Sequence, residues 1–344
     1  MTSQQWQQLI SVLHGELLNS PPIGFIIDSP WLPGWFGIST LDYYASENLW
    51  FDANVKAIET FPEVMFLPGF WSEYGMATEP SAFGARIVWA EENLPHAEKM
   101  IRQPSDIDSL VSPNVKSDGL GPFVIQRLRS HQERIASLGH EIKFAIARGP
   151  LNIASFLMGT SEFLMLLAME PQRAHALLEK ITAFLEAWLR YQKDCFASID
   201  GILVLDDIVG FVGPTDMQEF VVPYVKRLFD SFPASVRLFH NDAHGLVCAP
   251  LLEEMNVNLF NFGFEHSLPD MRQAVGENVA LLGNLPPRDV LALGSPQDVK
   301  HKTLEMWNSI EDKRGIIWSC GGGMPQHVST ENIRAFVDTI NSQT

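Results

Sequence analysis

Eight short apolar runs constrain the fold of this 344-residue chain more than any other feature. Each is followed by a polar residue or a Gly/Pro break and then by a helical pattern. The runs are GFII (24–27), VMFL (64–67), IKFAIA (142–147), ILVL (202–205), VRLF (236–239), VNLF (257–260), VALL (279–282) and GIIW (315–318). Predominantly apolar strands that alternate with helices are typical of a parallel sheet covered on both faces. Eight of them over this length predict an α/β fold of the (β/α)8-barrel type, as one domain over residues 1–344.

Two further segments are expected around this barrel. Near the N-terminus, apolar residues such as Trp6, Leu9 and Val12 lie on one helical stripe and predict a helix packed on the body. The stretch 69–121 is too long for one connection, so we expect an insertion over the barrel mouth. It should hold a hairpin around ARIVWAEE (85–92) and extra helices.

The charge balance narrows the classes of partner. Acidic side chains outnumber basic ones by 41 to 24, for a formal charge of −17, and no Lys or Arg precedes Lys56. Such a chain repels polyphosphates and anionic membrane surfaces, so we expect neither nucleic acid nor membrane as a partner. Only three cysteines, an N-terminus without a basic signal region and no apolar run near the ~20 residues of a membrane span indicate a cytoplasmic protein.

In a barrel of this type, the residues that do chemistry follow the strands at the C-terminal face. The polar residues at those positions are Asp28, the segment 69–79 with Glu79 at its end, Arg148, Asp206, Asp207, His240, Asp242, Asn261, Asn284 and Cys320. We therefore expect Asp28, Glu79, Arg148 and Asn284 to bind substrate. Asp206, Asp207 and His240 are the candidates for a catalytic role.

The segments FHNDAHG (239–245) and SCGGG (319–323) suggest a metal site. An imidazole at His240, a carboxylate at Asp242 and a thiol at Cys320 would give three ligands of kinds that zinc, or another divalent metal, accepts while a fourth position stays open for substrate. Two alternatives stand beside this prediction. Asp242 is also suited to capping a helix that begins near Ala243, and a free Cys is often simply buried.

Other strand-end residues carry alternatives of their own. Neighbouring residues on a strand point to opposite sides, so one of Asp206 and Asp207 should face the mouth and the other the helix layer. Trp35 lies in an aromatic loop after Asp28, which suggests a lid over substrate or, equally, aromatic rings packed under helices. Arg148 would clamp a substrate carboxylate or neutralise Asp206.

Over most of its length, about residues 22–340, the chain resembles the uroporphyrinogen decarboxylase superfamily. The resemblance rests on the order of segments such as EPSAFGARI (79–87), LFHNDAHG (238–245), LLGNLPPRDVLALGSPQDV (281–299) and STENIRAFVDTI (329–340). It implies a (β/α)8 barrel, in agreement with the count of apolar runs. The superfamily also contains zinc-dependent methyltransferases that act on methylated corrinoid proteins.

Two branches of this superfamily make different demands on the sequence. The decarboxylases bind a substrate with eight carboxylates, partly through an arginine-rich segment near the N-terminus, and here the matching loop DSPWLPGWFGIS (28–39) lies in the stretch without Lys or Arg. The methyltransferases carry a His-x-Cys pair and a later Cys that bind zinc. This chain has His240 and Asp242 at the pair, and Cys320 matches the later Cys, so the resemblance favours the methyltransferase branch with one thiolate replaced by a carboxylate.

The sequence thus predicts methyl transfer between a small substrate and a corrinoid protein, with the methylcorrinoid carried by that partner. Two alternatives stay open. One is a decarboxylase-like lyase that acts on a porphyrinogen or another carboxylated substrate, and the other is a barrel that binds a tetrapyrrole or a corrinoid protein without catalysis.

Overall fold

Eight parallel strands form the centre of the molecule, which we describe for residues 1–343 from a computed structural model. They are β1 (Gly24–Ile26), β2 (Met65–Leu67), β5 (Phe144–Arg148), β6 (Gly201–Leu205), β7 (Val236–Asn241), β8 (Leu259–Phe262), β9 (Ala280–Leu285) and β10 (Ile316–Cys320). Six of them pair in the order β10-β9-β8-β7-β6-β5, and β1 pairs with β2. A parallel bridge between Ile23 and Trp318 joins the two sets. All eight predicted strands, and the (β/α)8 fold, are confirmed.

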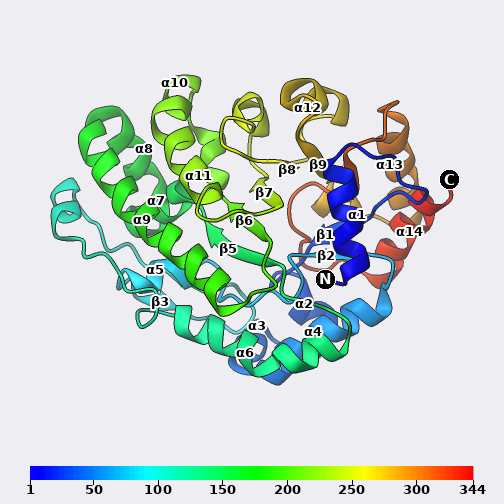
Figure 1. Cartoon of the computed structure of the whole chain (residues 1–344), viewed down its shortest axis with the longest axis horizontal. Coiled ribbons are helices and arrows are strands. Elements are labelled where there is room, and N and C mark those ends of the chain that lie inside the picture. The colour runs from blue at the N-terminus through cyan, green and yellow to red at the C-terminus, as the bar shows by residue number, and fades with distance from the viewer. Residues whose placement is uncertain (344) are drawn as a thin grey trace.

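Helices surround these strands on the outside (Figure 1). They include α4 (Glu47–Thr60), α6 (Gly121–Ser137), α9 (Pro171–Cys195), α11 (Val222–Phe229), α12 (Leu268–Val275), α13 (Pro296–Asn308) and α14 (Thr330–Asn341). Their starts follow from local chemistry. Ser295 closes a capping box with Asp298 at the start of α13, and Ser329 accepts the backbone N–H of Asn332 at the start of α14.

The first helix, α1 (Ser3–Leu13), closes one end of the barrel. Its apolar stripe, with Trp6, Leu9 and Val12, belongs to the same buried cluster as the inward side chains of the strands. In Figure 1 it accordingly lies over the strands rather than in the outer ring. Thr2 makes an antiparallel bridge to His140, which precedes β5. The predicted packed helix is confirmed, and it covers the end of the barrel opposite the mouth.

The segment 69–121 contains the helix α5 (Thr78–Ala82) and a 3₁₀ helix, η1 (Pro104–Ser109). It also contains a hairpin whose strands, β3 (Ile87–Val88) and β4 (His96–Ala97), have two residues each. The predicted hairpin is therefore present, although it is very short.

Within residues 1–343 no single helix is both long and apolar enough to cross a membrane. The pair α7 (Pro150–Met158) and α8 (Thr160–Met169) reaches that length only together and bends by 110° between them.

Candidate metal centre at the barrel mouth

Strand alternation decides which side chains reach the mouth. On β5, Phe144 and Ile146 pack inside the barrel, so Arg148 points inward at the strand's end. On β7, Val236 and Leu238 are inside, which places His240 on the inner face and Asn241 on the outer one. The same alternation brings Asp28, Arg148, Asp207, His240, Asn261 and Asn284 to the inner side of the strand ends.

Three of these groups form a cluster suited to a metal ion. One ligand atom from each of Asp207, His240 and Asp242 lies within 4.8 Å of the other two. The Nε2 atom of His240 is 3.6 Å from Oδ1 of Asp207 and 3.9 Å from Oδ2 of Asp242. One imidazole and two carboxylates are a donor set that divalent metals accept, and three protein ligands leave positions open for substrate.

The imidazole of His240 is held in the orientation that a metal ligand needs. Its Nδ1 lies 2.6 Å from Oδ1 of Asn261. The amide nitrogen of Asn261 donates to the carbonyl of Leu282 at 2.8 Å, which fixes Oδ1 toward the imidazole. Because an amide oxygen only accepts, Nδ1 carries the proton, and in the neutral ring Nε2 presents its lone pair to the two carboxylates.

The two carboxylates of the cluster repel each other without a cation between them. Burial, Asp207 and a hydrogen bond shared with Asp207 raise the pKa of Asp242, whereas His240 acts in the opposite direction. The carboxyl group of Asp242 sits against Gly322, where a Cβ would lie 2.6 Å from Oδ2. Gly322 has φ +87°, so glycine serves both the backbone conformation and the close approach.

A second charged cluster lies beside the first. The guanidinium of Arg148 donates to both carboxylate oxygens of Glu73 at 3.2 Å, and its backbone N–H donates to Glu79 at 2.9 Å. Glu73, Arg148 and His240 all act on the carboxyl group of Asp28 and oppose the effect of its burial. Burial raises the pKa of Asp28 to about 6 and that of Glu73 well above its ordinary range, and Arg148 opposes both shifts.

Asp206 requires a correction, because it faces the helix layer rather than the mouth. Its carboxylate accepts the backbone N–H groups of Leu151 at 2.8 Å and Asn152 at 3.0 Å, at the start of α7. Gly149 packs so closely on it that a Cβ there would lie 2.7 Å from Cγ of Asp206. Asp206 therefore positions a helix, and the structure leaves Asp207 as the aspartate of the mouth.

Cys320 also points away from the mouth. It shares the outer face of β10 with Ile316 and Trp318, which belong to the core between strands and helices. Its thiol is fully buried, lies 3.7 Å from the carbonyl oxygen of Gly322, and has its pKa raised to about 12 by burial. The thiol is absent from the cluster, in which Asp207 is the third group.

Trp35, predicted to cover substrate, packs on the outside of the barrel. It lies on α2 (Leu32–Phe36), stacks on Trp31 at 4.8 Å and donates to the hydroxyl of Thr330 on α14 at 3.0 Å. The alternative of rings packed under helices is the one that the structure shows. Asn284 lies at the mouth, but its amide donates to the carbonyls of Gly263 and His266 and thereby holds the loop after β8.

Two residues of the site were not singled out from the sequence. Glu73 lies within the segment 69–79, which was expected at the mouth only as a whole, and Asn261 appeared among the strand-end residues without a role. The signal for Asn261 is its place on β8 in register with His240 on β7. Glu73 follows an irregular loop, for which no periodicity predicts direction.

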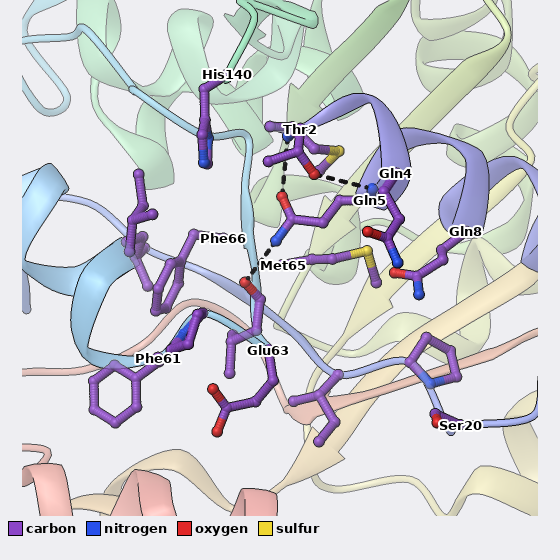
Figure 2. A pocket seen from close by; sticks show the side chains of 18 of the residues that line it. Thr2, Gln4, Gln5, Gln8, Ser20, Phe61, Glu63, Met65, Phe66 and His140 are labelled. Carbon is purple, nitrogen blue, oxygen red and sulfur yellow. Dashed lines mark hydrogen bonds between the residues drawn. The ribbon is translucent and has the colours of Figure 1, made fainter. Parts of the chain in front are cut away.

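One hollow of the protein lies away from this site. A cavity of about 580 Å³ borders α1, α4 and the residues around β2 (Figure 2). Gln5 spans it by donating to the carbonyl of Val64 at 3.1 Å and pairing with Thr2. Its lining is mostly amide, hydroxyl and apolar groups, with Glu63 and His140 as titratable side chains. None of the three clustered groups Asp207, His240 and Asp242 lines this hollow.

Comparison with known proteins agrees with this architecture. The sequence profile of the uroporphyrinogen decarboxylase (URO-D) family matches residues 9–343. The chain belongs to this family. It is 26% identical over 276 residues to the uroporphyrinogen decarboxylase of Chloroherpeton thalassium, covering 77% of this chain and 76% of that one. With the uroporphyrinogen decarboxylase of Thermus thermophilus the identity is 28% over 299 residues, covering 83% and 81%.

Among solved structures, a methyltransferase from Methanosarcina mazei superposes with a TM-score of 0.83 over 98% of both chains, at 16% identity. At that identity the likeness shows the shared barrel fold. The family membership and the fold together place this chain among enzymes built on the uroporphyrinogen decarboxylase-like barrel.

Proposed function

We propose that this protein transfers a methyl group between a small substrate and a corrinoid protein, with a divalent metal held by Asp207, His240 and Asp242. The observation that carries the proposal is the imidazole of His240, which Asn261 holds through Nδ1 while Nε2 lies 3.6 Å from Asp207 and 3.9 Å from Asp242. When bound, zinc or another divalent metal would act as a Lewis acid on the heteroatom that gives or takes the methyl group. A corrinoid carried by the partner protein would accept the methyl group from the substrate, or donate it in the reverse direction.

The donor set also narrows the substrate. One nitrogen and two oxygen ligands leave a metal more Lewis-acidic than a set with thiolates, and they suit harder metals and harder substrate atoms. The chain's own residues contribute charge and orientation. Asn261 keeps the His240 ring in place, and Gly322 gives Asp242 the room to reach it.

Decarboxylation of a highly acidic porphyrinogen fits this mouth less well. Arg148, the guanidinium at the strand ends, is already paired with Glu73. Asp28, Glu79 and Asp207 also act on Arg148, and Asp242 lies beside Asp207, so this acidic mouth opposes the binding of a polyanion. The named decarboxylase relatives are at most 28% identical to this chain, which leaves room for a different substrate.

The surface around the mouth suits a docked partner. Large apolar side chains are exposed on the loops that follow four successive strands of the barrel: Phe211 (60%) after β6, Leu246 (38%) after β7, Phe264 (46%) after β8 and Leu293 (76%) after β9. We refer to these four residues as the apolar rim. Large exposed apolar side chains at the end of the molecule that carries a site favour contact with another protein, and a partner bound at this end would present its cofactor to the mouth.

The test is a methyl-transfer assay on metal-loaded protein with free cob(I)alamin as acceptor. Methyl ethers, methylamines and methyl thioethers serve as donors, and the absorbance of methylcobalamin reports transfer. We expect one bound divalent ion per chain and transfer from at least one donor class, both lost in His240→Ala. His244→Ala is the matched control, because His244 is exposed and pairs with Glu265 outside the cluster.

Protein that binds no metal, or transfer that does not depend on metal or on His240, would contradict the proposal. Release of carbon dioxide from uroporphyrinogen, with no methyl transfer from any donor, would assign the site to decarboxylation instead.

A further inference from the structure

The strands of the barrel leave one seam between them. Within residues 1–343, β5 ends one sheet and β2 ends the other, and no hydrogen-bonded ladder connects these two strands. Residues of the N-terminal segment fill part of the seam. Thr2 bridges His140 before β5, and the carboxamide of Gln5 donates to the carbonyl of Val64, just before β2, at 3.1 Å. The cavity of about 580 Å³ lies along this seam, with Val64 and His140 both in its wall (Figure 2).

One polar side chain in this cavity lacks the partner that a buried group normally has. His140 is only 7% exposed, and its ring meets Phe70 edge-on, with 6.0 Å between the ring centroids. The imidazole makes no hydrogen bond or ion pair with any other side chain or carbonyl of residues 1–343. In Figure 2 it points into the cavity. Because buried polar groups nearly always have a partner, this orientation favours a polar molecule in front of the ring.

The glutamines of the sequence QQWQQ (4–8) supply further polar groups. Gln4, Gln5 and Gln8 line the cavity from α1, whereas Gln7 is exposed and lies outside the lining. The carboxamide of Gln5 is already hydrogen-bonded through both its oxygen and its nitrogen. The carboxamides of Gln4 and Gln8 make no hydrogen bond within residues 1–343. Each of these two groups can therefore both donate to a ligand and accept from it.

The titratable groups of the lining are neutral or paired at neutral pH. Burial and the amino group of Met1 lower the pKa of His140 to about 4, so the ring is uncharged and has one donor and one acceptor. Burial also lowers the pKa of that amino group to about 5, and it donates to the carbonyl of Glu141 at 3.0 Å. Glu63 pairs with Arg334 at 2.9 Å. An ion in this cavity would lose hydration without meeting a free countercharge, so the lining favours an uncharged ligand.

The rest of the lining is apolar and includes Ile23 and the ring of Phe66. Ligand sites of this volume typically combine apolar walls with a few polar groups that orient the ligand. We infer that the cavity binds an uncharged heteroaromatic molecule whose ring edge carries both hydrogen-bond donors and acceptors. The ring packs on the apolar wall, and its edge meets His140, Gln4 and Gln8. The site is separate from the metal ligands, so the inference does not depend on the proposed function.

Nicotinamide and nicotinate are matched probes, because they have nearly the same shape and only nicotinate is charged at neutral pH. Ligand-detected NMR titration of the full chain measures the affinity of each. We expect nicotinamide to bind at least about tenfold more tightly than nicotinate. Gln8→Leu removes one hydrogen-bonding group and should lower the affinity for nicotinamide by about three- to tenfold. Gln7→Leu is the matched control, because Gln7 lies on the same helix outside the lining.

Two further variants locate the bound probe. His140→Phe keeps an aromatic ring but removes both nitrogens, and it should weaken nicotinamide binding by about tenfold. If this buried substitution prevents folding, as thermal unfolding would show, Gln8→Leu decides alone. His240→Ala should bind nicotinamide as wild type does, since His240 lies at the mouth. No binding of nicotinamide, equal binding of nicotinate, an affinity that Gln8→Leu leaves unchanged, or loss of binding in His240→Ala would each overturn the inference.

Discussion

At the residue scale, the hydrogen bond made by one polar atom of a side chain decides how its other polar atom is directed at the mouth. His240 can offer Nε2 to a metal only because Asn261 occupies Nδ1. Asn261 in turn keeps its oxygen toward the ring because its nitrogen is bound to the Leu282 carbonyl. Two hydrogen bonds in series, from the Leu282 carbonyl on β9 to Asn261 and from Asn261 to His240, thus fix the orientation of the imidazole ring.

Replacing Asn261 tests this chain of bonds. In Asn261→Leu the imidazole loses its acceptor and is free to turn or change tautomer, so we expect metal affinity to fall by about 10- to 100-fold. Competition with a chelating dye would measure the affinity. Asn93→Leu, on the exposed hairpin loop, is the control, and an unchanged affinity in Asn261→Leu would show that the ring is held by other contacts.

At the element scale, two adjacent aspartates after β6 serve different parts of the fold. Asp206 follows the outer face of the strand and binds the first N–H groups of α7, while Asp207 follows the inner face and meets His240. The helix end favours a negative or hydrogen-bonding group at this point. Asp206 therefore contributes to the stability of the fold, and the neighbouring Asp207 contributes to the candidate metal site.

This separation predicts opposite phenotypes for matched substitutions. Asp206→Ala should lower the free energy of unfolding by about 1–3 kcal/mol because two buried N–H groups lose their acceptor. It should leave the metal ligands in place. Asp207→Ala should weaken metal binding and cost little stability. Urea unfolding and metal titration on both variants measure the two effects, and equal losses of stability would contradict the division.

Asp206 also makes stability depend on pH. Burial raises its pKa to about 8, against the backbone N–H groups of Leu151 and Asn152, whereas an unfolded aspartate releases its proton near pH 4. Between these values the folded state binds more protons, so the contribution of Asp206 to stability falls as pH rises. The stability difference between wild type and Asp206→Ala should accordingly shrink between pH 5 and pH 8, and a difference that grows would overturn this account.

The loop after β10 makes an equally local prediction. Gly322 combines φ +87° with a close approach to the carboxyl group of Asp242. In Gly322→Ala the new Cβ would displace that carboxyl group, so metal affinity should drop while His240 stays oriented. Gly323→Ala is the matched control, because nothing lies within 4 Å of the site of its Cβ. Equal affinities in the two variants would show that Asp242 is not a ligand.

At the scale of the whole molecule, the two ends of the barrel have different roles. Helix α1 fills the N-terminal end with apolar side chains, whereas the C-terminal end carries both charged clusters and the apolar rim. The net charge of −17 gives the whole molecule long-range repulsion toward anionic partners, and salt weakens that repulsion.

The apolar rim predicts a phenotype that depends on the acceptor. The double variant Phe211→Glu with Leu293→Glu should slow methyl transfer to a corrinoid protein by about tenfold or more, since it places charge in the docked surface. Transfer to free cob(I)alamin should be unchanged. Leu17→Glu, at an exposed position that follows α1, is the control, and equal effects on the two acceptors would place the rim outside the docking surface.

The sequence by itself determined the eight strands, their order and the end of the barrel at which polar groups gather, because apolar runs and their spacing are local properties of the chain. The tertiary structure decided which of those polar groups meet. The direction of a strand-end side chain changes with a shift of one residue, and the run GIIW ends two residues before β10 does, so the outward direction of Cys320 needed the observed strand bounds. The pairing of Glu73 with Arg148, and the choice of Asp207 over Asp206, depend on contacts between segments that are far apart in the sequence and that only the packed fold brings together.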